Sequence, residues 1–205
     1  MPIKAVLTGD LIDSQTAENT MAYLKALEAV LKTLKAPFNI KADTFRGDGF
    51  QVIPKHPERA LRCAVALRAG LIAASPAEER WDARIAIGLG EAESKKHFGE
   101  AFVLSGQGLD SMKRSTLGFF CSNEELLARI ELATEFVAAI VDKWTVVEAQ
   151  TYYVQLVKGL DQQGTAQALN KSRVTVNKAL QRAQSRLIDR YLDNTENWIK
   201  ELINA

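Results

Sequence analysis

Histidine and cysteine are scarce in this sequence, which holds two of each among 205 residues. His56 and His97 lie far apart and have no cysteine or histidine at metal-ligand spacing, so a zinc or haem site is not expected. Cys63 and Cys121 each lie within apolar sequence, which favours buried free thiols over a disulfide. The chain also lacks a GxSxG motif and a Cys-His pairing, so no motif supports a hydrolase with a nucleophilic serine or cysteine.

Long apolar runs are absent as well. No run approaches the roughly 18 residues that a membrane span requires, and residues 1–10 hold no signal-peptide core or cleavage site. We therefore expect a cytoplasmic protein without membrane attachment. The charges nearly balance, with a net charge of +1, so the total indicates no partner, although a local basic patch can lie within such a total.

The order of apolar patterns predicts an α+β domain followed by helices only. Buried strands are expected at residues 3–10, 83–90 and 117–122, and a β-hairpin at 38–45 and 50–53 around the turn RGDG. Helices are expected at 14–35, from Pro57 to about residue 71 and at 123–144, and a loop that enters a helix at 99–114. Ser14 is expected as the first cap and Pro37 as the stop of the first helix. From about residue 145 no strand pattern remains. We predict two domains, residues 1–144 and 145–205.

Two carboxylates are expected at one edge of the sheet. Asp10 ends the first strand, and Asp48 lies at the hairpin tip. If that strand pairs beside the hairpin, the two acids repel unless a cation neutralises them, and Mg²⁺ held with a substrate phosphate fits such a site. The residues expected to contact the phosphate are Gly9, Arg46, Gly47 and Gly49. The alternative, that these Gly-Asp pairs serve only as turns, stays open.

An ordered series of segments resembles the catalytic core of class III nucleotidyl cyclases. The segments are KAVLTGDLIDS, TFRGDGFQV, HPERALRCAVALR, ARIAIGLGEA and FGEAFVLSGQGLD. The whole chain is similar to the SatD family of bacterial proteins, in which a cyclase-like domain precedes a helix-turn-helix. The resemblance implies a ferredoxin-like, class III cyclase-like sheet with helices on one face over residues 3–122. It also places Asp10 and Asp48 at the two metal-binding aspartates of the cyclases.

The other catalytic positions of the cyclases do not carry over. Their counterparts here are Val103 for the transition-state Asn, Gln107 for the catalytic Arg, Thr44 for the purine-selecting Lys and Lys96 for its acidic partner. Because phosphoryl transfer depends on positive groups around the phosphate, we do not expect a competent cyclase and assign no catalytic residue. Positive charge for nucleotide binding can come instead from Arg46, Lys95 and Lys96.

Residues 162–187 have the spacing of a helix-turn-helix. Ala166 is small where two helices must cross, and Asn170 stands at the place of a left-handed turn residue. Ser172 is a good N-cap for the second helix. Val176, ten residues after Ala166, supplies a β-branched core residue.

The same stretch is basic. Residues 163–190 contain six basic residues and one acid, Asp189, a net charge of +5 in a chain whose total is +1. Such a local charge suits a helix that contacts the phosphates and base edges of duplex DNA. The predicted DNA-binding residues are Lys171, Ser172, Arg173, Thr175, Asn177, Lys178 and Arg182. The alternative is an ordinary basic helix that packs on the N-terminal domain or on a partner.

Two functions from different classes are consistent with these patterns. The first is a DNA-binding transcriptional regulator, active as a homodimer, whose cyclase-like domain dimerises and senses a nucleotide or phosphate ligand. The second is an Mg²⁺-dependent enzyme that handles nucleotides without being a competent cyclase. A third, weaker hypothesis gives the C-terminal helices protein contacts only.

Overall fold

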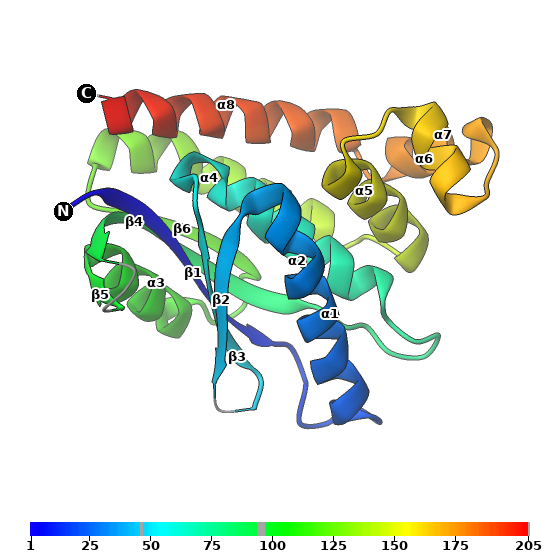
Figure 1. The fold of residues 1–205 in the computed structure, drawn as a ribbon, viewed down its shortest axis with the longest axis horizontal. Helices are drawn as coiled ribbons and strands as arrows, with labels where there is room; N and C mark the ends of the chain where they lie inside the picture. The colour runs from blue at the N-terminus through cyan, green and yellow to red at the C-terminus, as the bar shows by residue number, and fades with distance from the viewer. Residues whose placement is uncertain (46, 94–96, 205) are drawn as a thin grey trace.

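The computed structural model describes residues 1–45, 47–93 and 97–204, and it shows a mixed six-stranded sheet surrounded by helices (Figure 1). The strands are β1 (Ile3–Leu11), β2 (Ile40–Phe45), β3 (Gly49–Pro54), β4 (Ala83–Glu93), β5 (Phe98–Gly99) and β6 (Leu117–Cys121). The helices are α1 (Thr20–Phe38), the short η1 (Pro57–Arg59), α2 (Ala60–Ala73), α3 (Glu100–Ser111), α4 (Glu124–Val141), α5 (Val146–Lys158), α6 (Gln162–Leu169), α7 (Arg173–Arg182) and α8 (Ser185–Asn204).

Strand β1 lies inside the sheet, whose strand order is β2-β3-β1-β4-β5. It pairs antiparallel with β3 on one side and with β4 on the other, and β6 runs parallel beside β4. A strand with neighbours at both edges and helices over both faces is buried in its middle, which explains the apolar run from Ala5 to Leu7. The predicted hairpin is present, and it pairs with the first strand.

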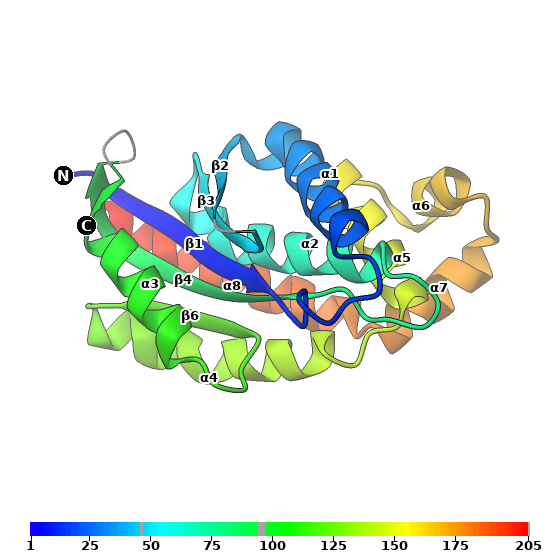
Figure 2. The same cartoon turned by 90° about the horizontal axis from the view of Figure 1, so that it is seen from below.

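The helices cover both faces of the sheet (Figure 2). Helices α1, α2 and α4 share a hydrophobic core with the face that carries Leu7 and Ile87. Helix α3 packs on the opposite face, where Thr8 Oγ1 and Ser105 Oγ are 2.8 Å apart and where Gly88 is too close to α3 to accept a Cβ. The expectation of helices on one face is therefore wrong. The connection from β4 to the parallel β6 must cross the sheet, and α3 crosses on the face that α1 and α2 leave open.

The first helix begins and ends later than its predicted range of 14–35. Its N-cap is Asn19, whose side chain accepts a hydrogen bond from the backbone of Ala22, whereas the hydroxyl of Ser14 donates to Asp48. The helix passes Pro37 because this proline lies in the last turn, where only one intrahelical hydrogen bond is lost. It ends at Asn39, which has a left-handed conformation with a φ of 48°.

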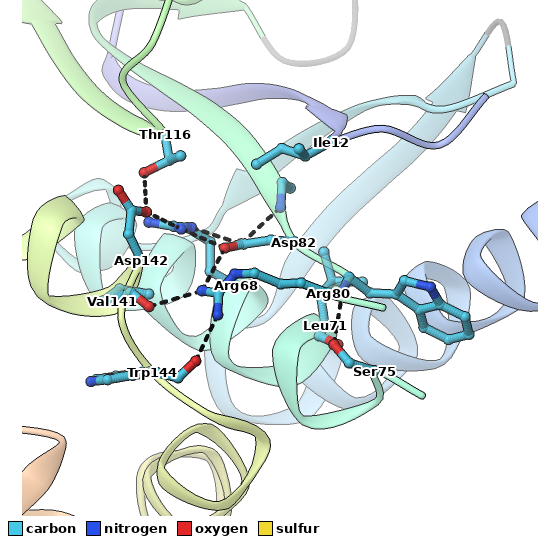
Figure 3. Close-up of polar contacts among 12 residues, drawn as sticks. Ile12, Arg68, Leu71, Ser75, Arg80, Asp82, Thr116, Val141, Asp142 and Trp144 are labelled. Atoms are coloured by element: carbon cyan, nitrogen blue, oxygen red, sulfur yellow. Dashed lines mark hydrogen bonds and ion pairs between the residues drawn. The ribbon is translucent and has the colours of Figure 1, made fainter. Parts of the chain in front are cut away.

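A buried ion pair joins α2 to the start of β4. Arg68 is fully buried, and its Nε and Nη2 atoms donate to the carboxylate of Asp82 at 2.9 and 2.6 Å (Figure 3). Its Nη2 atom also donates to Asp142 at 2.7 Å, just beyond α4. Asp142 accepts a further hydrogen bond from Thr116, next to β6. One arginine thus links α2, β4, β6 and α4.

Arg80 extends this network to the end of α4. It donates to the carbonyl oxygens of Val141 at 3.0 Å and Trp144 at 2.6 Å, and to Asp82 at 3.1 Å (Figure 3). Carbonyl groups at a helix end have no intrahelical partner, so these contacts satisfy them. The indole nitrogen of Trp144 in turn donates to the carbonyl of Ala183, between α7 and α8.

The C-terminal helices pack on the sheet and its helices. Helix α5 lies against α2, and α8 runs back along α2 and α4 so that the two termini lie near each other, opposite α6 and α7 (Figure 1). Arg62 on α2 donates to Glu196 at 2.5 Å and to Asp193 at 2.7 Å on α8. No helix in the described part of the chain is long and apolar enough to cross a membrane.

We expect Asp82→Ala to destabilise the protein by about 3–5 kcal/mol, because it leaves the buried guanidinium of Arg68 without its main carboxylate. Urea denaturation followed by circular dichroism measures this loss. The control is Asp193→Ala, which removes an exposed partner of Arg62 and should cost about 0–1 kcal/mol. Equal losses in the two variants would contradict the role given to the buried pair.

Candidate functional site

The two predicted metal-binding aspartates lie in one cavity of about 460 Å³ at the edge of the sheet. Asp10 is near the end of β1, and its register partner on β3 is Gly49, next to Asp48. The backbone N–H of Leu11 donates to the carbonyl of Asp48 at 3.3 Å, which holds the strand and the hairpin tip together. Asp13, which follows β1, also lines the cavity. The expected proximity of the two acids is therefore present.

The carboxylate of Asp10 is paired with Arg84. The two residues are register partners on β1 and β4, and the Nε and Nη2 atoms of Arg84 donate to the two carboxylate oxygens at 2.9 and 2.5 Å. Its Nη1 atom donates to the carbonyl of Met112 at 2.9 Å, which fixes the guanidinium plane. The hydrogen bond to Asp10 raises the pKa of Arg84. The guanidinium of Arg84 therefore offsets part of the negative charge of the carboxylates that line the cavity.

Asp48 ties two loops together. The buried hydroxyl of Ser14 donates to its Oδ2 atom at 2.5 Å, and the hydroxyl of Thr20 donates to the carbonyl of Ser14 at 3.0 Å. Asp48 therefore anchors the segment between β1 and α1 on the hairpin tip. This contact gives the residue a structural role beside any role in binding.

The cavity fits an ion together with a phosphate better than an ion alone. Both oxygens of Asp10 accept hydrogen bonds from Arg84, and Lys113 adds a second cation to the lining. In the described parts of the chain, no group of three or more His, Cys, Asp or Glu side chains is arranged to hold a metal ion. Mg²⁺ bound to a phosphate takes only one or two protein carboxylates. Asp48 and Asp13 are the carboxylates that would hold it here, and the ion would neutralise phosphate charge.

Packing and backbone conformation account for the glycines that were expected to contact phosphate. Gly9 lies inside the sheet, and a Cβ on it would be 2.5 Å from the ring of Phe50, so packing requires glycine there. Gly47 has a φ of 83°, which the turn requires. Gly49 pairs with Asp10 across the strands. The predicted residues Arg46, Lys95 and Lys96 lie outside the described residues.

The predicted site residues do not include Arg84 or Lys113. The strand pattern ARIAIG does indicate that Arg84 faces away from the core, because Ile85 and Ile87 alternate with it. Its contact with Asp10, however, joins residues 74 positions apart. That contact depends on the β1–β4 register, which no local pattern gives.

Helices α6 and α7 form a second candidate site, with the turn at its predicted place. Asn170 ends α6 in a left-handed conformation, with a φ of 51°. The hydroxyl of Ser172 caps α7 and accepts a backbone hydrogen bond at 3.1 Å. Ala166 and Val176 are buried between the helices. The local signals in the sequence therefore correctly place these two helices and their connection.

The predicted DNA-binding residues fall into two groups. Three are held by side chains of the protein: Lys171 by Gln150 at 3.3 Å, Asn177 by Gln162 at 3.1 Å and Arg182 by Glu148 at 2.6 Å. The other four are exposed on α7 or at its N-cap: Ser172, Arg173, Thr175 and Lys178, with the hydroxyls of Ser172 and Thr175 2.8 Å apart. The exposed group lies on one short stretch of helix.

Comparison with known proteins gives matches among solved structures only. A scan against protein-family models found no match, and neither did a search of curated proteins. Among solved structures, the chain is similar to the guanylyl cyclase Cya2, with 20% identity and a TM-score of 0.44 over 62% of this chain and 77% of that chain. We draw no functional conclusion from a likeness at this level, and membership of the SatD family stays a prediction.

We expect Arg84→Gln to create an affinity for Mg²⁺ alone, because Asp10 would lose its paired guanidinium in a cavity that Asp13 and Asp48 also line. At roughly ten times its dissociation constant, the ion should stabilise the variant by about 1–2 kcal/mol, measured as a rise in Tm. The control is Arg114→Gln, which makes the same charge change and should show no response. A response of equal size in wild type would contradict neutralisation of the site by Arg84.

Proposed function

We propose that this protein binds duplex DNA through α7 and acts as a transcriptional regulator. The observation that carries this proposal is the exposed side of α7, which carries Arg173, Thr175 and Lys178, while Val176 on the same helix is buried. A helix presented in this way can enter the major groove with its N-terminal residues at the base edges. Helices α6 and α7 lie at one end of the molecule, which leaves room for a duplex (Figures 1 and 2).

The electrostatics of this end support the proposal. The net charge between residues 163 and 190 is +5, and Arg186 and Arg190 at the start of α8 are exposed as well. The N-terminus of α7 adds the positive end of its helix dipole. Phosphate groups are attracted both by this positive charge, to which the two arginines belong, and by the helix dipole.

One apolar side chain is exposed among these polar groups. Val174 on α7 has 63% of its surface exposed. An apolar side chain at the start of such a helix can contact the methyl group of thymine, which direct readout uses to identify an A·T pair. We assign phosphate contacts to Arg173 and Lys178, and base contacts to Val174 and Thr175.

Among the predicted DNA contacts, Arg182 also helps to hold α7 in place. Its guanidinium donates to Glu148 on α5 at 2.6 Å, so its removal would disturb the packing of α7 on α5. A loss of DNA binding in an Arg182 variant would therefore have two causes, a lost phosphate contact and a displaced helix. Arg173 and Lys178 provide the cleaner test.

The sheet domain completes the proposed regulator. DNA-binding proteins of this kind usually act as symmetric dimers, and we propose that the sheet domain makes the dimer contact. Phe45 and Phe98 have 45% and 66% of their surface exposed, and burial by a second copy would remove this apolar area from water. The cavity at Asp10 would sense a nucleotide or phosphate ligand.

The double variant Arg173→Ala and Lys178→Ala should weaken DNA binding and reduce the slope of log K against log salt by about 2, one for each lost phosphate contact. Fluorescence anisotropy of a labelled duplex at several salt concentrations measures both quantities. The control is Lys25→Ala and Lys32→Ala on α1, which removes the same charge and should leave the slope unchanged. Absence of duplex binding by the wild type at low salt would overturn the proposal.

A second function, nucleotide handling, is favoured by the composition of the cavity at Asp10. Three carboxylates lie there with Arg84 and Lys113, a set that suits phosphate oxygens together with a divalent cation. In this function Lys113 and Arg84 bind and orient the phosphate, and Asp48 holds the cation. The positions of the cyclase Asn and Arg are Val103 and Gln107, both exposed on α3, so cyclisation is not proposed.

ATP or GTP should raise the Tm of the wild type in the presence of Mg²⁺, because a ligand that binds only the folded state stabilises it. Lys113→Gln should remove this rise, since the exposed lysine contributes charge to the cavity rather than to the core. Arg114→Gln, beside it in sequence, should keep it. If neither nucleotide raises the Tm of the wild type, nucleotide handling is wrong.

A further inference from the structure

A cavity of about 810 Å³ lies where α4, α5, α7 and α8 meet. This volume falls within the range of pockets that bind small molecules, roughly 300–1,000 Å³. Most of its lining is apolar, and the principal side chains are Phe136, Val137, Ile140, Trp144, Leu187 and Tyr191. The cavity is separate from the one at Asp10, with which it shares no described lining residue.

The apolar lining is partly open to water. Phe136 and Leu187 have 65% and 43% of their surface exposed. Leu132, one turn before Phe136 on α4, is 61% exposed. An apolar surface of this kind is costly in water unless a ligand or partner covers it.

One end of the cavity is polar and carries more positive than negative charge. Lys143 and Arg182 line it together with a single carboxylate, Glu148. Glu148 accepts hydrogen bonds from the backbone and hydroxyl of Thr145 and from Arg182 Nε. Burial opposes ionisation of Glu148, but these hydrogen bonds prevail and lower its pKa below the ordinary glutamate value. Glu148 is therefore ionised at neutral pH and fully engaged.

Lys143 and Arg182, the two cations at this end, both have N–H groups without a hydrogen-bond acceptor in the described part of the chain. Of the guanidinium nitrogens of Arg182, only Nε has a hydrogen-bond partner among the described residues, and Lys143 has none there. A neutral apolar ligand would shield these donors from water without replacing their hydrogen bonds. An anionic group would accept charge-assisted hydrogen bonds from both.

We infer that this cavity binds an amphipathic anion, with its apolar body along α4 and α8 and its carboxylate-like head at Lys143 and Arg182. The volume, the apolar walls and the cationic end together define this class of ligand. A second copy of the chain could instead cover the apolar rim, and the oligomeric state distinguishes that occupant from a small ligand.

The cavity adjoins the segment that positions α7. Arg182 is the last residue of α7, and Gln184, with a φ of 54°, begins the turn into α8. Trp144, in the wall, donates to the carbonyl of Ala183 between them. A ligand head that competes with Glu148 for Arg182 would change the contact that holds α7 to α5. This link to α7 gives the ligand a route to DNA binding and rests on the proposed function, whereas ligand binding itself does not.

The test compares decanoate with decanol, which have the same chain and differ in the charged head. Calorimetric titration of the full-length protein should show decanoate binding about tenfold more tightly, since only it can pair with the cations. Lys143→Gln should remove most of this preference, and Lys200→Gln, an exposed charge elsewhere on α8, should keep it. Ala139→Trp, at the rim of the cavity, should abolish binding of both probes while the urea midpoint stays unchanged.

Equal affinity for the two probes, or no effect of Lys143→Gln, would overturn the inference. So would a wild-type dimer that binds neither probe and becomes monomeric in Ala139→Trp, because the cavity would then be an interface between copies. Decanoate binding in a protein that binds no duplex would overturn the proposed function and leave this inference intact. Duplex binding without decanoate binding would overturn this inference and leave the proposed function intact.

Discussion

The buried ion pair between Arg68 and Asp82 fixes the arrangement of both parts of the molecule. Removal of two charges from water costs on the order of several kcal/mol per ion, and Arg68 Nη1 has no hydrogen-bond partner among the described residues, which adds to that cost. The network offsets it by adding Asp142 as a second carboxylate. Through Arg80 and Trp144 the same network reaches Ala183. A continuous path of contacts therefore leads from the centre of the fold to the end of α7, the helix assigned to DNA.

Local signals in the sequence predict most elements, and contacts between distant residues explain where prediction fails. The turn at Asn170 and the cap at Ser172 follow from residue types a few positions apart, and the structure has both. The predicted start of α1 is wrong because Ser14 and Asn19 are both good caps, and only the contact of Ser14 with Asp48 decides between them. The position of α3 on the second face and the pairing of Arg84 with Asp10 depend on sheet register. Sequence periodicity indicates which face of the sheet a residue occupies, but not which residue of the neighbouring strand lies beside it.

Ion pairs within the protein also engage some of the charged residues in the candidate sites. Asp10 and Asp48 do share a cavity, but one is paired with an arginine and the other anchors a loop. On α7, Arg182 is paired with Glu148, so Arg173 and Lys178 are the residues to which we assign the proposed phosphate contacts. Each surface has its own chemistry: α7 suits the phosphates of a duplex, the cavity at Asp10 suits a phosphorylated ligand, and the cavity at Trp144 suits an amphipathic anion. Of the two cavities, only the one at Trp144 is lined by a residue of α7, Arg182.

Hydrogen–deuterium exchange of the full-length protein, with and without duplex DNA at low salt, tests the central claim most directly. It reports the protection of backbone amides segment by segment, so it locates the contact as well as detecting it. We predict that the duplex slows exchange in residues 171–178 and leaves the segment around Asp13 and Ser14 unchanged. Protection confined to the sheet domain, or no protection at all, would contradict it.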